Sequence, residues 1–190
     1  MTGLTDAATR NGEARTETAQ EPVVRSSAGR RVLAALRIVI GFTFLWSFLD
    51  SALGLSYSTA PEDAWIAGES PTQGYLMGAS DGTLGPLWEA MAGNPVVDVL
   101  FMLALLGLGV AAISGAGLRV AAVAGPLLAL GLYASQLPLE SGAANNPVTT
   151  DHWYYALLFP LFALLDAGRT WGLAGTWERL PIAQRFPWLR

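Results

Sequence analysis

The stretch VLAALRIVIGFTFLWSFLDSALGL, residues 32–55, decides the fold because it is apolar almost throughout. A helix needs roughly 20 mainly apolar residues to cross the hydrocarbon core of a bilayer, and this stretch is long enough. Three further apolar blocks follow it along the chain. We therefore predict an all-α integral membrane protein, a four-helix bundle with spans at about 32–55, 95–114, 118–137 and 152–171.

The composition also indicates lipid as the main solvent. Of the 190 residues, 52% are hydrophobic and only 14% are charged, and the mean hydropathy is +0.39. Soluble domains carry about 25% charged residues. The chain has no cysteine and one histidine, which excludes thiol chemistry and a bis-histidine haem within one chain. We expect no haem, no iron–sulfur cluster and no metal, so any redox-active group would have to be borrowed.

The arginines predict how the spans are oriented, because all eleven basic residues are arginines. Apart from Arg37, which is inside the first span, and two in the N-terminal tail, they lie just before the first span, between the second and third, or near and after the end of the fourth: Arg25, Arg30, Arg31, Arg119, Arg169, Arg179, Arg185 and Arg190. The two remaining loops, 56–94 and 138–151, contain none. The positive-inside rule then predicts a protein of the cytoplasmic membrane with both termini in the cytoplasm and both loops outside.

Three regions follow from this pattern. Residues 1–30 are polar without periodicity and are predicted to form a disordered cytoplasmic tail, and residues 31–174 form the transmembrane domain. Residues 175–190 interleave aromatic side chains with arginines, which predicts an amphipathic juxtamembrane tail at an anionic leaflet. A binding site for a soluble partner is the alternative interpretation of this last region.

The long first outer loop, residues 56–94, is rich in glycine, proline, serine and aspartate, which indicates turns. Residues 86–91 within it are predicted to form a short helix that carries Trp88. Together with Trp65 and Tyr75, this tryptophan indicates that the loop folds back onto the outer mouth of the bundle.

Small residues predict how closely the spans pack. They recur at four-residue spacing on the second and third spans, at Gly107, Ala111 and Gly115 and at Ala121, Gly125 and Ala129. Such spacing lets helix backbones approach each other within a membrane. Pro126 and Pro160 lie inside the third and fourth spans, where each is expected to kink its helix.

Charged residues within spans are costly, so each is a candidate for a function. Arg37 lies roughly 9 Å inside the cytoplasmic end of the first span, and Asp166 lies at a similar depth in the fourth. We predict that the two form a structural ion pair. The alternatives are that Arg37 extends its side chain to the interface and that Asp166 pairs with Arg169.

A second set of charges lies near the outer ends of the spans. Asp50, Asp98, Asp151 and the single histidine, His152, converge there without a nearby arginine. Clustered carboxylates beside an imidazole can hold or pass protons, so Asp50, Asp98 and His152 are the candidate catalytic residues. Asp98 and Asp151 are also explained as helix-start residues, and His152 as a solvated helix end.

Four aromatic residues accompany this outer set. Trp46 and Trp153 offer flat faces on which a ring can stack, and Tyr154 and Tyr155 offer hydroxyl donors. These residue types could together hold a flat ring that carries hydrogen-bond acceptors. An aromatic belt at the membrane interface is the alternative explanation for the residues that open the fourth span.

The chain resembles the DoxX/DoxD-like membrane protein family over about residues 31–190. The resemblance rests on LRIVIGFTFLWSFLD at 36–50, AWIAGESPTQGYL at 64–76, NPVVDVLFMLALLGLGVAAISGAGLRVAA at 94–122, NNPVTTDHWYYAL at 145–157 and GLAGTWERLP at 172–181. It implies the membrane subunit of a thiosulfate:quinone oxidoreductase or of a related assembly that handles thiol or oxidative stress. The expected cofactor is then a membrane quinone, whose carbonyl groups need hydrogen-bond donors and whose reduction takes up protons. Trp46, Trp153, Tyr154 and Tyr155 would bind it, and the expected partners are the lipid bilayer and another subunit.

Two other functions are open at this point. The chain could be a non-catalytic scaffold or assembly partner that presents its long outer loop, or a small transporter or proton pathway that uses the buried carboxylates. The second is less favoured because the spans show no inverted repeat. No nucleic-acid partner is expected, and the sequence leaves a homo-oligomer open.

Overall fold

The computed structural model describes residues 23–138, 146 and 148–189, and the regular structure in that part of the chain is helical throughout. Its four longest helices are α2 (Ser27–Leu53), α5 (Pro95–Ser114), α6 (Leu118–Ser135) and α7 (Asp151–Leu164). Of these, α2, α5 and α6 are long and apolar enough to cross a membrane. Most of the predicted N-terminal tail, at 1–22, and of the second outer loop lies outside the described residues.

Local signals in the sequence explain where two of these helices begin and end. Ser26 precedes α2 and its hydroxyl accepts from the Gly29 backbone N–H at 3.2 Å, while Asn94 caps α5 in the same way through the Val96 N–H at 3.0 Å. Both helices end at a glycine with positive φ, a conformation that glycine adopts at little cost. Helix α5 ends at Ser114, which is the predicted end of the second span.

The fourth predicted span is shorter than expected. It was predicted to reach residue 171, but α7 ends at Leu164 and is roughly 21 Å long at 1.5 Å per residue. The chain then takes a left-handed conformation at Asp166, with φ 50°, and continues as the 3-10 turn η3 (Ala167–Arg169). The residues that follow α7 supply carbonyl groups to Arg37, so they turn inward and do not extend the helix.

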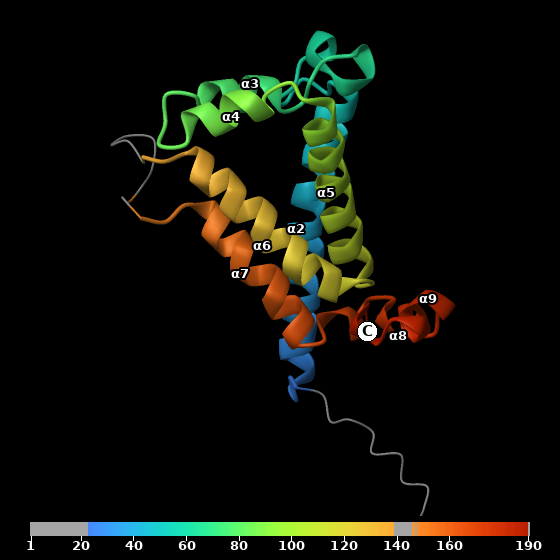
Figure 1. Cartoon of the computed structure of the whole chain (residues 1–190). Coiled ribbons are helices and arrows are strands. Elements are labelled where there is room, and N and C mark those ends of the chain that lie inside the picture. The colour runs from blue at the N-terminus through green and yellow to red at the C-terminus, as the bar shows by residue number, and fades with distance from the viewer. Residues whose placement is uncertain (1–22, 139–145, 147, 190) are drawn as a thin grey trace, which may run out of the picture.

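The long helices form two pairs that diverge toward one end of the molecule (Figure 1). Helix α2 packs along α5, and α6 packs along α7. The short helices α3 (Gln73–Gly78) and α4 (Gly85–Met91) lie across the divergent end, and α8 (Ala174–Trp177) and α9 (Pro181–Arg185) lie at the convergent end (Figure 1). The predicted short helix in the first loop is confirmed by α4.

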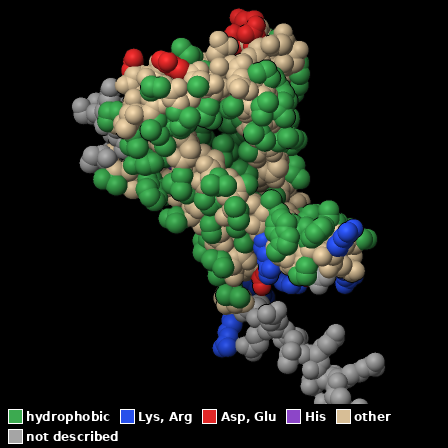
Figure 2. Space-filling view, viewed as in Figure 1, with side chains coloured by type: hydrophobic (Ala, Val, Ile, Leu, Met, Phe, Trp, Pro, Cys, Tyr) green, Lys and Arg blue, Asp and Glu red, His purple; other side chains and the backbone are tan. Residues whose placement is uncertain are grey.

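The two ends of the molecule differ in charge, as Figure 2 shows. Acidic side chains gather over the end with α3 and α4, which we call the acidic end, and arginines gather at the end with α8 and α9, which we call the arginine end. The helix surfaces between them are largely apolar (Figure 2). Large apolar side chains are exposed there, as membrane-spanning helices require: Val39, Phe42, Leu100, Leu103, Val110, Val123, Leu127, Leu157 and Leu164.

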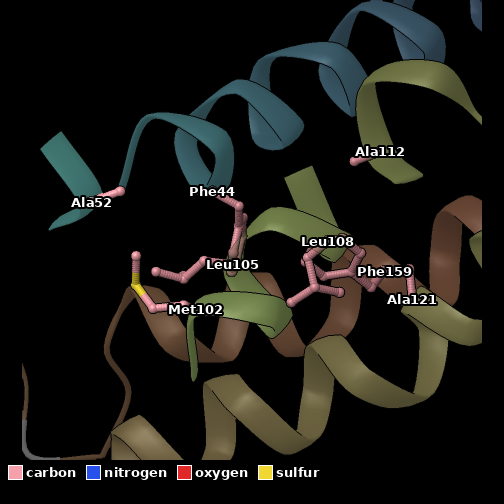
Figure 3. Packing of buried hydrophobic residues seen from close by; sticks show 8 residues of the cluster. All are labelled: Phe44, Ala52, Met102, Leu105, Leu108, Ala112, Ala121 and Phe159. Atoms are coloured by element: carbon pink, nitrogen blue, oxygen red, sulfur yellow. The ribbon is translucent and has the colours of Figure 1, made fainter. Parts of the chain in front are cut away.

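The main core joins the two helix pairs (Figure 3). Phe159 of α7 is fully buried and meets the ring of Phe44 of α2 edge to face, with the centroids 5.1 Å apart. Met102, Leu105 and Leu108 of α5 complete the contact. The first loop does fold back onto the bundle, because its Trp65 packs against this core and its Trp88 is buried in a second cluster under α3.

The small residues pack partly as predicted. Ala121, Gly125 and Ala129 of α6 are buried, and a Cβ atom on Gly125 would lie 2.9 Å from the Cβ of Phe159 in α7. On α5 the predicted face is wrong in part, because Gly107 is exposed with nothing within 4 Å of its Cβ position. Gly109 makes the close approach instead, and a Cβ there would lie 2.7 Å from the backbone N of Leu45.

Gly107 and Gly109 therefore give a matched test of the α2–α5 contact. Gly109→Ala is expected to lower the free energy of unfolding by about 1–3 kcal/mol, because the added methyl group forces the two backbones apart. Gly107→Ala is expected to raise it by about 0.5–1 kcal/mol through helix propensity alone. Denaturation by sodium dodecyl sulfate in mixed micelles measures both, and equal effects of the two substitutions would contradict the packing.

Arg37 binds backbone carbonyl groups and not Asp166. It is fully buried, and its guanidinium donates to the carbonyl oxygens of Ala112 and Ile113 (2.9 Å) at the end of α5. It also donates to Thr170 (3.4 Å) and Trp171 (3.0 Å) beyond α7. The last carbonyls of a helix have no partner within the helix, so the guanidinium satisfies them and joins three segments.

The predicted ion pair between Arg37 and Asp166 is thus wrong for the part of the chain that the structure describes. Asp166 is exposed, and neither alternative holds, because Arg37 has no exposed surface and Arg169 pairs with Glu178 at 2.8 Å. The sequence places Arg37 and Asp166 at similar depths. It does not show that α7 ends before Asp166, or that the carbonyl groups of Thr170 and Trp171 accept from Arg37.

Candidate functional site

A cleft of about 990 Å³ lies at the acidic end, between the two helix pairs and beside α3. Side chains from α2, α5, α6 and α7 line it together with residues of the first loop. The apolar part of its lining includes Phe44, Phe101, Leu105, Ala129 and Leu132, and more than half of the lining residues are polar. A cleft of this size, with both apolar and polar side chains in its lining, can hold a small molecule.

One wall of the cleft carries hydroxyl groups from α2. Thr43, Ser47 and Ser51 follow each other at four-residue spacing, which places them on one face of the helix. The Thr43 hydroxyl donates to the carbonyl of Val39 at 3.2 Å, and the Ser47 hydroxyl donates to the carbonyl of Thr43 at 3.0 Å. Their oxygen atoms keep lone pairs free, so this wall can accept hydrogen bonds from a ligand.

The mouth of the cleft is acidic. Asp63, Glu69 and Asp151 line it with Gln73 and Gln136, and the described lining includes no arginine. The arginines gather at the opposite end of the molecule (Figure 2). An anion entering this mouth would meet like charge, so the cleft favours neutral or cationic ligands.

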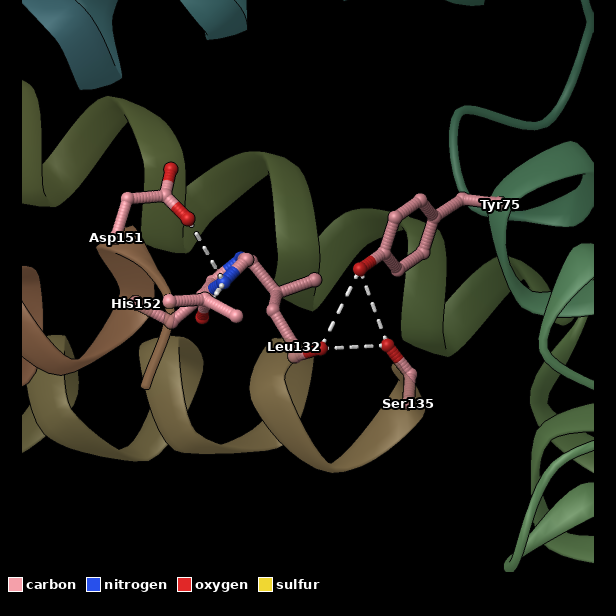
Figure 4. A network of polar contacts seen from close by, with 6 residues as sticks. Tyr75, Leu132, Ser135, Asp151 and His152 are labelled. Atoms are coloured by element: carbon pink, nitrogen blue, oxygen red, sulfur yellow. Dashed lines mark hydrogen bonds and ion pairs between the residues drawn. The ribbon is translucent and has the colours of Figure 1, made fainter. Parts of the chain in front are cut away.

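His152 stands at this mouth on the first turn of α7 (Figure 4). Its Nδ1 lies 3.2 Å from Asp151 Oδ1 and 3.0 Å from Thr150 Oγ1. The His152 side chain is 13% exposed, whereas that of Asp151 is 64% exposed. Both contacts engage Nδ1 and orient the ring, which leaves Nε2 for a ligand in the cleft.

Asp50 and Asp98 do not line the cleft with His152. Asp50 is buried and its Oδ2 accepts from the Ser58 N–H (2.8 Å), the Ser58 hydroxyl (2.7 Å) and the Thr59 N–H (3.0 Å), while Oδ1 accepts from the Tyr57 N–H (3.2 Å). Four donors on one carboxylate fix the start of the first loop against α2. This arrangement supports a structural role for Asp50 and does not support a proton relay.

Asp98 has a comparable role on α5. It is buried, and its Oδ1 accepts from the hydroxyls of Ser70 (2.8 Å) and Thr72 (2.5 Å). Ser70 lines the cleft, and Thr72 immediately precedes α3. Asp98 therefore holds the segment that leads into α3, in addition to its favourable place in the first turn of a helix.

Of the four predicted ring-binding residues, only Tyr155 lines the cleft. Its ring packs edge to face on Phe44, with the centroids 5.2 Å apart. Trp153 packs instead against Tyr133, Trp46 packs against Tyr57, and Tyr154 is 61% exposed. His152 and Tyr155 are three residues apart on α7 and therefore share the face of the helix that lines the cleft. Trp153 and Tyr154 lie on other faces of α7, and Trp46 lies on α2.

Tyr75 of α3 lines the cleft and fastens α3 to the end of α6 (Figure 4). The Tyr75 hydroxyl donates to the carbonyl of Leu132 at 3.3 Å and accepts from the Ser135 hydroxyl at 3.1 Å. Leu132, Gln136 and Gln73 were not singled out in the sequence, and no local signal marks them. They become part of the site only because α3 lies over the end of α6.

Comparisons with models of protein families, with curated proteins and with solved structures find no match to this chain. The resemblance to the DoxX/DoxD-like family stays a prediction.

Proposed function

We propose that the cleft binds the ring of a membrane quinone and that the chain is the DoxX/DoxD-like membrane subunit of a quinone-linked oxidoreductase. The observation that carries this proposal is the placement of His152 and Tyr155 in the lining of one cleft at the acidic end, together with apolar side chains such as Phe44 and Phe101. The apolar part of the lining suits the ring, and the imidazole and phenol groups can donate to its carbonyl oxygens.

In the proposed arrangement, α7 completes a four-helix bundle because it packs along α6 for most of its length. The arginine end faces the cytoplasm and the acidic end faces outward in the plasma membrane, in keeping with the positive-inside rule. The mouth of the cleft then opens on the outer side of the membrane.

The cleft residues then have distinct roles. Reduction of a quinone by two electrons takes up two protons, and in this proposal the electrons come from the partner subunit. His152 is placed to donate a proton through Nε2 and to take up the next one there from water at the mouth of the cleft, while Asp151 accepts from Nδ1 and holds the ring in place. Tyr155 holds the ring, and the hydroxyl-bearing wall of α2 accepts a hydrogen bond from the reduced product.

Quinone retained by the purified protein tests this proposal. Wild-type protein in mild detergent is expected to carry about one lipid-soluble quinone per site, and His152→Ala is expected to lose most of it. Tyr155→Phe is expected to weaken binding about threefold to tenfold, since one hydrogen bond of about 0.5–1.5 kcal/mol is removed. The matched control is Tyr154→Phe, because Tyr154 is exposed and lies outside the cleft.

Two outcomes would overturn the proposal. Quinone at background level in every protein would favour a non-catalytic scaffold or assembly partner. Quinone that is lost equally in Tyr154→Phe and Tyr155→Phe would show that it is held by the lipid-facing surface and not by the cleft.

A further inference from the structure

The C-terminal residues 171–189, which we call the C-terminal unit, are folded against the arginine end of the bundle. The backbone N–H of Leu173 donates to the carbonyl of Ser114 at 2.7 Å, and the Trp177 indole N–H donates to the carbonyl of Leu189 at 2.8 Å. Ala183 and Leu189 are buried within the unit. These contacts close the segment into a small structure with a fixed surface.

That surface is unusually apolar. Six large side chains of the unit are between 41% and 64% exposed: Trp171, Leu173, Leu180, Ile182, Phe186 and Trp188. If these side chains were exposed to water, they would promote aggregation. Their exposure therefore indicates a surface that contacts something apolar.

The unit also carries cations without acidic partners. Arg179 and Arg185 are exposed, and neither makes an ion pair with a described residue. The Arg185 guanidinium lies 5.7 Å from the centroid of the Phe186 ring. The only acidic residue between 171 and 189 is Glu178, and it already pairs with Arg169. The surface is therefore complementary to anions.

We propose that the C-terminal unit is a docking surface for the anionic phospholipid headgroups of the adjacent leaflet. The apolar side chains enter the boundary between headgroups and acyl chains, and Arg179 and Arg185 bind the lipid phosphates. Helices α8 and α9 run crosswise to α5 at the level where α5 ends (Figure 1), as amphipathic segments in the plane of an interface do. The proposal is independent of the quinone site.

Lipid is favoured over a soluble protein by the position of the unit. It lies where the apolar length of α5 ends and where the exposed Arg119 begins α6 with a further positive charge. Tryptophan and arginine side chains at this depth are typical of the headgroup region.

The chain has no cysteine, so single labels can be placed in the full-length protein. A nitroxide at Ile182→Cys reports the apolar side of α9, and one at Gln184→Cys reports a direction about 200° away around the same helix. Both proteins are reconstituted in phosphatidylcholine bilayers with and without phosphatidylglycerol. Collision with oxygen, compared with a water-soluble nickel complex, gives the immersion of each label.

With phosphatidylglycerol, the label at 182 is expected to be immersed and the label at 184 to stay in water. In the double variant with Arg179→Gln and Arg185→Gln, the equilibrium between the immersed and the water-exposed position of the label at 182 is expected to shift toward water by about fivefold for each arginine removed. In pure phosphatidylcholine the two substitutions are expected to have no effect.

Three results would overturn the proposal. A label at 182 that is in water in both bilayers would show that the surface serves another partner, such as a soluble protein. Equal immersion in both bilayers would show that anionic headgroups are not recognised. Equal immersion with and without the two arginines would show that the arginines do not bind the phosphates.

Discussion

Arg37→Met is expected to lower the free energy of unfolding by about 3–5 kcal/mol, because a buried carbonyl left without a donor costs about 1–3 kcal/mol and this substitution leaves several. The guanidinium of Arg37 donates to carbonyls at the end of α5 and in the segment beyond α7. Methionine fills a similar volume but donates no hydrogen bond, so the three segments lose the group that joins them.

Two further variants separate charge from geometry. Arg37→Lys keeps the charge, but one ammonium group cannot span carbonyls of two segments, so its loss of stability is expected to be intermediate. Arg119→Met removes an exposed arginine and is expected to change stability by less than about 0.5 kcal/mol. Unfolding in mixed micelles measures all three, and Arg37→Met as stable as Arg119→Met would contradict this role.

Asp50→Asn is expected to loosen the start of the first loop by about 1.5–3 kcal/mol, the usual net value of a hydrogen bond to a charged group. Asparagine can keep its oxygen on the Ser58 side, but its amide group then faces the Tyr57 N–H, which also donates. Hydrogen exchange at the amides of Tyr57, Ser58 and Thr59 is expected to accelerate about 10-fold to 150-fold.

The control for this prediction is Asp63→Asn, which removes an exposed carboxylate at the mouth of the cleft. Exchange at the same three amides is expected to stay unchanged in that variant. If Asp50→Asn kept these amides protected and yet abolished quinone turnover, Asp50 would be a proton relay and the structural role would be wrong.

Much of the fold is visible in the sequence because spans in lipid must be long and apolar. The limits of α5 follow from Asn94, Pro95 and Gly115, which are strong local signals for the two ends of a helix. The early end of α7 is not visible in this way. The end of α7 depends on hydrogen bonds from Arg37 to the carbonyl oxygens of Thr170 and Trp171, and Arg37 is far from these two residues in the chain.

The sequence predicts only part of the candidate site, because contacts between residues that are distant in the chain again decide the rest. The sequence places Asp50, Asp98 and His152 near one end of the molecule, but a charge at matched depth can face any side. The first loop returns to Asp50 and Asp98 with its own donors, which removes both carboxylates from the cleft. His152 and Tyr155 line the cleft because of how α7 packs against the other helices, which only the structure shows.

The central claim is that the cleft holds the quinone ring, and photolabelling tests it most directly. A quinone analogue with a photoreactive group on its ring is bound to the purified protein, irradiated, and mapped by peptide mass spectrometry. We expect adducts on the start of α7, at His152 and Tyr155, and on the hydroxyl-bearing wall of α2, and we expect excess quinone to prevent them. Adducts confined to the exposed outer faces of the helices, or adducts that excess quinone does not displace, would contradict the claim.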